Sequence, residues 1–125
     1  MLAEYGDIDI ALDPFPFTGG LTSCEALWMG VPVVTWPQSR VVSRQTFAYL
    51  SAIGLSGLAA GNAGDYVRIA VDLAADRNRL DAWRAGLRER MRASALCDVA
   101  GFTASLERAF FELHETIARE AATER

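Results

Sequence analysis

The chain has 125 residues, of which 51% are hydrophobic, and a formal net charge of −4. That length allows one hydrophobic core and is too short for two ordinary domains. All twelve cationic residues are arginines, scattered along an acidic chain, which argues against a nucleic-acid-binding protein because such proteins carry a basic stripe. There is no secretory signal and no apolar run near the ~20 residues that cross a bilayer, so we expect a cytoplasmic protein without membrane contacts.

The first residues predict a short helix that leads directly into a buried strand. Residues 1–5 have helical character, and Gly6 is a suitable C-terminal cap. Ile8 to Leu12 has the loose alternation expected of a parallel strand covered on both faces. A stub of helix before a buried strand indicates a fragment, with sequence missing upstream.

A proline-rich loop and a glycine turn follow this strand. Asp13 to Phe17 is stiffened by two prolines, and its two phenylalanines either pack under the loop or line a pocket. After Thr18, the pair Gly19 and Gly20 allows positive φ and a close approach of a ligand to the backbone.

The next helix is predicted to begin with a polar cap. Thr22 or Ser23 would cap it, Glu25 would lie in its first turn, and Gly30 would end it before the strand from Val31 to Trp36. One interpretation is an ordinary capped helix in which the glutamate interacts favourably with the positive end of the helix dipole. The other is a phosphate site, because a βαβ unit presents free helix N–H groups at the carboxyl end of its first strand.

A second helix is expected from Ser43, as N-cap, to Ile53, with Gly54 as its stop. Arg40 precedes it in a loop near the expected ligand edge of the sheet. Arg44 would lie in the first turn, where a cation opposes the helix dipole. Its partner would therefore be a carboxylate or a ligand phosphate.

The remainder is predicted to be helical after a short strand or extended edge from Leu55 to Ala60. Asp65 would cap a helix that ends at Ala75 and buries Val67, Ala70, Val71 and Ala74. A helix from Asn78 carries an apolar stripe of Leu80, Trp83, Leu87 and Met91. On the same helix, the cationic row of Arg84, Arg88 and Arg92 is interpreted as a solvated face.

The last helix follows a break at residues 94–99 and carries a third apolar stripe, made of Phe102, Leu106, Ala109, Phe110 and Leu113. Its polar tail, residues 118–125, is expected to fray. His114, the only histidine, is interpreted as solvated. Cys24 and Cys97 lack CxxC spacing and a histidine companion, so we interpret them as reduced, mostly buried thiols and expect no metal site.

The segment from Leu12 to Thr35, LDPFPFTGGLTSCEALWMGVPVVT, resembles the carboxyl-terminal half of the O-linked N-acetylglucosamine transferase family, which includes tetratricopeptide-carrying bacterial relatives. The shared pattern is Leu-Asp, a proline, a glycine turn, a threonine-rich segment, an acidic residue, and then Leu-Trp, Gly, Pro and Val-Thr. The resemblance continues through AIGLSGLAA, LRERMRASALCD and SLERAF, and covers about Asp9 to Leu113.

The resemblance implies an α/β fold, namely a Rossmann-like half of a glycosyltransferase-B fold with a partial parallel sheet, flanking helices and a helical C-terminal tail. Residues 1–125 would be the C-terminal nucleotide-sugar-binding part of the catalytic region, with the repeats and the N-terminal Rossmann half upstream. The implied function is transfer of a sugar, most simply N-acetylglucosamine, from a UDP-sugar to Ser or Thr hydroxyls of a protein that the upstream regions bind. No cofactor or metal is implied, and no catalytic residue is assigned.

By the same resemblance, the diphosphate would be cradled by Gly19, Gly20, Leu21, Thr22 and Ser23. Glu25 would bind the ribose hydroxyls, and Arg40 and Arg44 are candidates for phosphate or loop contacts.

Three positions depart from the usual family pattern: Thr18 replaces asparagine, Leu21 replaces threonine, and Glu25 replaces aspartate. Gly20 is typical of bacterial members. Two alternatives stay open, a relative that uses UDP-glucose or GDP-fucose and a non-catalytic half-Rossmann module that binds a nucleotide or a partner chain.

Overall fold

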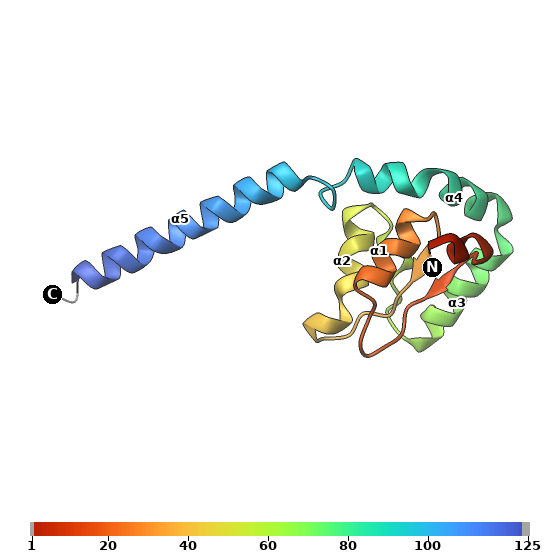
Figure 1. The fold of residues 1–125 in the computed structure, drawn as a ribbon. Helices are drawn as coiled ribbons and strands as arrows, with labels where there is room; N and C mark the ends of the chain where they lie inside the picture. The colour runs from red at the N-terminus through yellow and green to blue at the C-terminus, as the bar shows by residue number, and fades with distance from the viewer. Residues whose placement is uncertain (1, 124–125) are drawn as a thin grey trace.

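The computed structural model describes residues 2–123, with side chains through residue 120. Its elements, in chain order, are η1 (Leu2–Asp7), β1 (Ala11–Leu12), α1 (Leu21–Trp28), β2 (Val33–Val34), η2 (Val41–Ser43), α2 (Gln45–Ala52), η3 (Ser56–Leu58), α3 (Ala63–Ala75), α4 (Arg77–Arg92) and α5 (Val99–Thr123). Helices α1 to α4 surround the strands, while α5 extends away from this body (Figure 1).

The sheet is small and parallel. β1 pairs with β2, with Ala11 opposite Val33, and a parallel bridge between Thr35 and Ala59 extends the pairing. Both residues of β2, Val33 and Val34, are buried, and because successive strand residues point to opposite faces, both faces of β2 are covered. The predicted order of strand, helix and parallel strand is confirmed.

The strands are shorter than predicted, and β1 is not covered on both faces. Leu12 is 59% exposed, and Ile8 precedes the strand instead of belonging to it. The carbonyl oxygen of Ile8 accepts a hydrogen bond from the guanidinium of Arg84, so a side chain and not a neighbouring strand satisfies it. Gly6 does not cap the first element, because η1 runs on to Asp7.

Two helices end at the predicted glycines, for the predicted reason. Gly30 has φ +84° and Gly54 has φ +70°, in the left-handed region that favours glycine. After α1, the N–H of Val31 donates to the carbonyl of Ala26 at 2.8 Å, and the N–H of Gly30 to that of Leu27 at 3.1 Å. This pair of bonds is a Schellman motif, and Gly54 ends α2 in the same way.

The helix starts differ from the predictions by one to three residues. α1 begins at Leu21 after Gly20, without a side-chain cap, so neither Thr22 nor Ser23 caps it and Glu25 lies in its second turn. α2 begins at Gln45, and the N-cap position belongs to Arg44 instead of Ser43.

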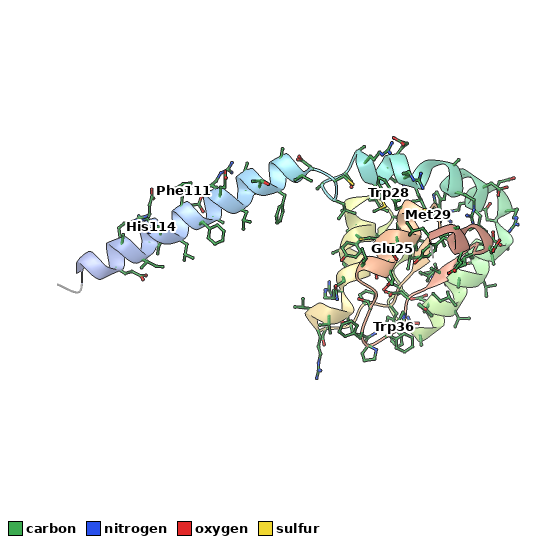
Figure 2. All side chains as sticks on the ribbon, in the orientation of Figure 1. Glu25, Trp28, Met29, Trp36, Phe111 and His114 are labelled. Carbon is green, nitrogen blue, oxygen red and sulfur yellow. The ribbon has the colours of Figure 1, made fainter. Side chains whose placement is uncertain are left out.

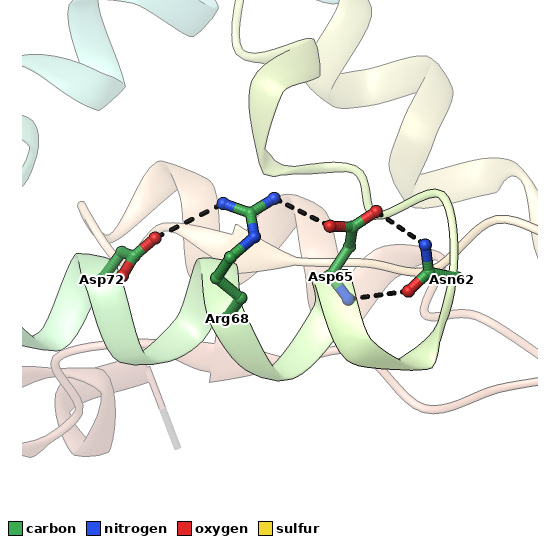
Figure 3. Close-up of polar contacts among 4 residues, drawn as sticks. All are labelled: Asn62, Asp65, Arg68 and Asp72. Atoms are coloured by element: carbon green, nitrogen blue, oxygen red, sulfur yellow. Dashed lines mark hydrogen bonds and ion pairs between the residues drawn. The ribbon is translucent and has the colours of Figure 1, made fainter.

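Asn62, and not Asp65, caps α3. The Oδ1 atom of Asn62 accepts from the N–H of Asp65 at 2.9 Å, and its Nδ2 donates to the Asp65 carboxylate (Figure 3). Asp65 also pairs with Arg68, which reaches Asp72 one turn later.

Of the four residues of α3 predicted to be buried, only Ala70 packs on the core. Val67 and Val71 are about 60% exposed, whereas Tyr66, Ile69, Ala70 and Leu73 pack on the core. The hydroxyl of Tyr66 donates to the carbonyl oxygen of Asp13 at 2.9 Å, and this long-range bond fixes the rotation of the helix. The predicted stripe of α4 is confirmed, since Leu80, Leu87 and Met91 are buried and Trp83 packs against them.

The cationic row of α4 is exposed at Arg88 and Arg92, as predicted, but it also contacts neighbouring elements. The Nε atom of Arg88 donates to the carbonyl oxygen of Trp28 at 2.9 Å, at the C-terminal end of α1. The guanidiniums of Arg88 and Arg92 lie 5.4 and 5.3 Å from the centre of the Trp28 ring. Cations at a helix C-terminus are favourable, so the row binds α4 to α1.

Helix α5 confirms the predicted helical tail, and its apolar stripe is exposed, with Phe102 and Phe110 more than 60% accessible. Figure 2 places Phe111 and His114 on this helix. The helix continues to Thr123, while Glu124 and Arg125, part of the tail predicted to fray, lie outside the described residues. Among residues 2–123, no helix combines the length and the apolar character that crossing a membrane requires.

Both cysteines are free thiols, but only Cys24 is partly buried and Cys97 is exposed. Burial raises the pKa of Cys24, although a hydrogen bond with Tyr49 partly opposes that effect. Since the thiolate is the reactive form, we expect iodoacetamide at pH 8 to modify Cys97 before Cys24, as followed by peptide mass spectrometry. The two should react at similar rates in urea, and faster modification of Cys24 in the folded protein would contradict this assignment.

Candidate functional site

The site is organised by a buried carboxylate at the carboxyl end of β1. Asp13 is 3% exposed, and its Oδ1 atom accepts a hydrogen bond from the N–H of Gly19 at 2.7 Å. Its Oδ2 atom accepts from the hydroxyl of Thr35 at 2.6 Å. The Asp13 side chain therefore connects the glycine turn to the residue that directly follows β2.

The loop between β1 and α1 is held at two further points. The N–H and the hydroxyl of Thr18 both donate to the carbonyl oxygen of Val42, at 3.2 and 2.9 Å. The ring of Phe15 contacts Trp36 and Tyr66 edge-on, with centroids 4.7 and 5.9 Å apart, so it packs beside the loop. Phe17 is 65% exposed. These contacts fix the part of the loop that precedes the glycine turn.

The glycine turn is tight, although its glycines do not have positive φ. A Cβ atom on Gly19 would lie 2.4 Å from the Oγ of Ser23 and 2.9 Å from the Oγ1 of Thr22, so a larger residue there would displace these hydroxyls. Gly20 has φ −100° and ψ −98°, and it directly precedes α1. The expectation of positive φ at this turn was wrong, and the groups that lie close to Gly19 are side chains of the protein itself.

The first turn of α1 presents one side chain to the core and two to the solvent. Ser23 is buried, and its hydroxyl is 2.8 Å from that of Thr46, which donates to the carbonyl oxygen of Gly19 at 3.1 Å. Leu21 and Thr22 are exposed. The N–H groups at the start of a helix have no acceptor within it, so this turn offers main-chain donors together with the Thr22 hydroxyl.

Two adjoining cavities lie against this turn. One of about 160 Å³ is lined by Asp13, Pro14, Thr22 and Ser23, among others. The second, of about 260 Å³, is lined by Thr22, Glu25 and residues of the N-terminal segment. Tyr5 and Thr22 border both cavities. The carboxylate predicted to bind a ribose is thus beside a cavity that continues toward the helix start.

Figure 2 shows Glu25 on the body of the molecule, away from α5. The hydroxyl of Tyr5 donates to the main-chain oxygen of Thr22 at 3.3 Å and lies near the Glu25 carboxylate. Burial, followed by the nearby Glu25 carboxylate, raises the pKa of Tyr5, so its phenol stays protonated at neutral pH.

The two loop arginines do not line these cavities. Arg40 is exposed, and its carbonyl oxygen accepts from the hydroxyl of Ser43 at 2.6 Å. The Arg44 guanidinium donates to the carbonyl oxygen of Gln38 at 3.3 Å and lies 5.3 Å from the centre of the Phe47 ring. A main-chain carbonyl and an aromatic ring thus stand where a carboxylate or a phosphate was expected.

Two residues of the site had no assigned role in the sequence. The position of Asp13, at the end of a strand directly before a proline loop, could have indicated a role. Its burial, however, depends on hydrogen bonds from Gly19 and Thr35, which only the fold brings to it. The position of Tyr5 indicated no role, because only the folded N-terminal segment brings it to Glu25. In the described part of the chain, no group of three or more His, Cys, Asp or Glu side chains could hold a metal ion.

Residues 5–106 match the model of glycosyl transferase family 41. The chain is 43% identical over 106 residues to a probable UDP-N-acetylglucosamine–peptide N-acetylglucosaminyltransferase SPINDLY of Petunia hybrida, covering 85% of this chain and 11% of that protein. It is 34% identical over 99 residues to a UDP-N-acetylglucosamine–peptide N-acetylglucosaminyltransferase of Caenorhabditis elegans, covering 79% of this chain and 9% of that protein. The chain thus spans about a tenth of the length of these relatives.

The structure is similar to that of a mutant O-GlcNAc transferase of Thermobaculum terrenum. The TM-score is 0.79 and the sequence identity 43%, over 87% of this chain and 21% of that one. This likeness confirms the expected fold, part of a Rossmann-like half of the glycosyltransferase-B type, and the resemblance to O-linked N-acetylglucosamine transferases is confirmed with it. The chain belongs to glycosyl transferase family 41.

Proposed function

We propose that this chain is the C-terminal nucleotide-sugar-binding part of a longer glycosyltransferase that moves N-acetylglucosamine from UDP-N-acetylglucosamine to Ser or Thr hydroxyls of a protein. The observation that carries the proposal is the position of the first turn of α1, whose Thr22 and Ser23 line a cavity at the carboxyl end of β1. The names of the relatives support the donor and the peptide acceptor.

In this proposal the diphosphate lies against the start of α1. The free N–H groups and the positive end of the helix dipole attract an anion there without a metal ion. Thr22 adds a hydroxyl on the exposed side, whereas the Ser23 hydroxyl is held by Thr46 and contributes through its main chain. Leu21, 74% exposed, adds apolar surface in place of a hydroxyl.

Glu25 binds the ribose in this arrangement. It lies one turn beyond the helix start, beside the cavity that Thr22 shares with the diphosphate position. A carboxylate that accepts from two neighbouring hydroxyls makes charge-assisted hydrogen bonds, which are stronger than neutral ones.

The chemical contribution of this segment is stabilisation of the leaving group. As an acceptor hydroxyl attacks the anomeric carbon, negative charge grows on the departing UDP, and preorganised N–H donors lower the energy of that state. We assign no catalytic base to these residues. The acceptor is bound outside them in the proposed full-length protein, which we place in the bacterial cytoplasm with tetratricopeptide repeats upstream.

Replacing Glu25 by Ala in the full-length protein should weaken UDP binding by roughly 1–3 kcal/mol, because the ribose hydroxyls lose their acceptor. Isothermal titration with UDP measures the change. Glu89→Ala is the matched control, since Glu89 pairs with Arg92 on the surface of α4 and should leave UDP affinity unchanged. An unaltered affinity in Glu25→Ala would remove that residue from the site.

Competing titrations also separate the alternatives. A protein that binds GDP better than UDP would indicate a GDP-sugar donor, and UDP-glucose turnover above that of UDP-N-acetylglucosamine would indicate a glucosyltransferase. Nucleotide binding without transfer to any protein hydroxyl would instead support a non-catalytic module.

A further inference from the structure

The N-terminal segment supplies a side chain to the candidate nucleotide site. Tyr5, in η1, borders both cavities beside α1. Its hydroxyl is near two acceptors on that helix, the main-chain oxygen of Thr22 at 3.3 Å and the carboxylate of Glu25. Tyr5 therefore touches the residue at the helix start and the residue one turn later.

Tyr5 is itself held from the opposite side. The guanidinium of Arg84, on α4, donates to the carbonyl oxygen of Tyr5 at 3.3 Å and to that of Ile8. The Asp9 carboxylate lies 3.3 Å from the guanidinium of Arg77 and 3.9 Å from that of Arg84. Because α4 also packs on α1, the segment that carries Tyr5 and the helix that carries Glu25 rest on the same support.

This arrangement restricts the Glu25 carboxylate. A glutamate on a helix surface has three rotatable side-chain bonds, and ordering it for a ligand costs conformational entropy. A protonated phenol beside the carboxylate restricts its orientation before the ligand arrives. The lone pairs that stay free on its two oxygen atoms can then accept from a pair of ribose hydroxyls.

We propose that Tyr5 is a positioning residue that orients Glu25 toward the ribose, and that it thereby makes the site selective for ribonucleotides over 2′-deoxyribonucleotides. The inference rests on the proposed function, because it requires UDP to occupy these cavities. Tyr5 acts through Glu25 and takes no part in the transfer reaction.

The test compares UDP with 2′-deoxy-UDP by isothermal titration of the full-length protein and its Tyr5→Phe variant. The wild type should prefer UDP, and Tyr5→Phe should lose about tenfold in UDP affinity, the effect of one hydrogen bond to a charged group, while 2′-deoxy-UDP binding changes little. The ratio of the two affinities is the informative readout. Partial misfolding lowers the amount of competent protein equally for both ligands and leaves this ratio unchanged.

Tyr49→Phe is the matched control. Tyr49 is also a half-buried tyrosine beside α1, but its hydroxyl meets Cys24, so its removal should keep the wild-type ratio. If Glu25→Ala abolishes the preference for UDP and Tyr5→Phe retains it in full, the positioning role is overturned. If UDP does not bind the wild type, or Glu25→Ala keeps the preference, the proposed function fails together with this inference.

Discussion

Replacing Asp13 by Asn should lower the free energy of unfolding by about 3 kcal/mol, because a buried charged acceptor with two donors loses one of its bonds. Both carboxylate oxygens accept, one from the N–H of Gly19 and one from the hydroxyl of Thr35. An Asn side chain is neutral and has a single oxygen, so both charge-assisted bonds of the carboxylate are lost or weakened. The change in the urea midpoint measures the loss.

The comparison variant is Asp72→Asn. Asp72 is exposed and pairs only with Arg68 at 3.4 Å among the contacts in the described residues, so its replacement should cost less than about 1 kcal/mol. The same Asp13 substitution should also weaken UDP binding, because the turn before α1 loses its anchor. Equal midpoints for the two variants would show that Asp13 does not hold the loop.

Gly30→Ala should destabilise the protein by about 2–5 kcal/mol. This figure is the sum of the strain of a left-handed φ and the cost of overpacking. Its φ is +84°, and a Cβ atom would lie 2.6 Å from the carbonyl oxygen of Arg84 and 3.0 Å from its Cα. Both are main-chain atoms, so α1 and α4 would have to separate. Since Arg84, Arg88 and Arg92 hold the same interface, the damage should extend to their contacts with η1 and Trp28.

Gly54→Ala separates the two causes. Gly54 also has positive φ, at +70°, but a Cβ atom there meets nothing within 4 Å. It should therefore cost only the strain, about 1–2 kcal/mol. Thermal unfolding of both variants gives the difference, and a Gly54 variant as unstable as the Gly30 variant would rule out the close approach of α4 as the cause.

The helix starts show where sequence reasoning loses precision. Several polar residues stand near each helix start, and in the sequence any of them could be the cap: Thr22 and Ser23 for α1, Asn62 and Asp65 for α3. The choice depends on which donor each side chain reaches after packing. The Ser23 hydroxyl is hydrogen-bonded to that of Thr46 on another helix, and the side chain of Asn62 accepts from the N–H of Asp65. The helix ends were easier, because only glycine adopts left-handed φ without strain.

By itself, the sequence determined the order of strand, glycine turn, helix and parallel strand, the ends of α1 and α2, the buried stripe of α4 and the resemblance to the O-linked N-acetylglucosamine transferase family. These features depend on residues close together in the chain and on spacing that repeats with the helix. Only the tertiary structure decided that Asp13 is buried, that the α4 arginines hold α1 and η1, and that Tyr5 meets Glu25. Such contacts join residues 17 to 79 positions apart, and no local pattern encodes which of them will meet.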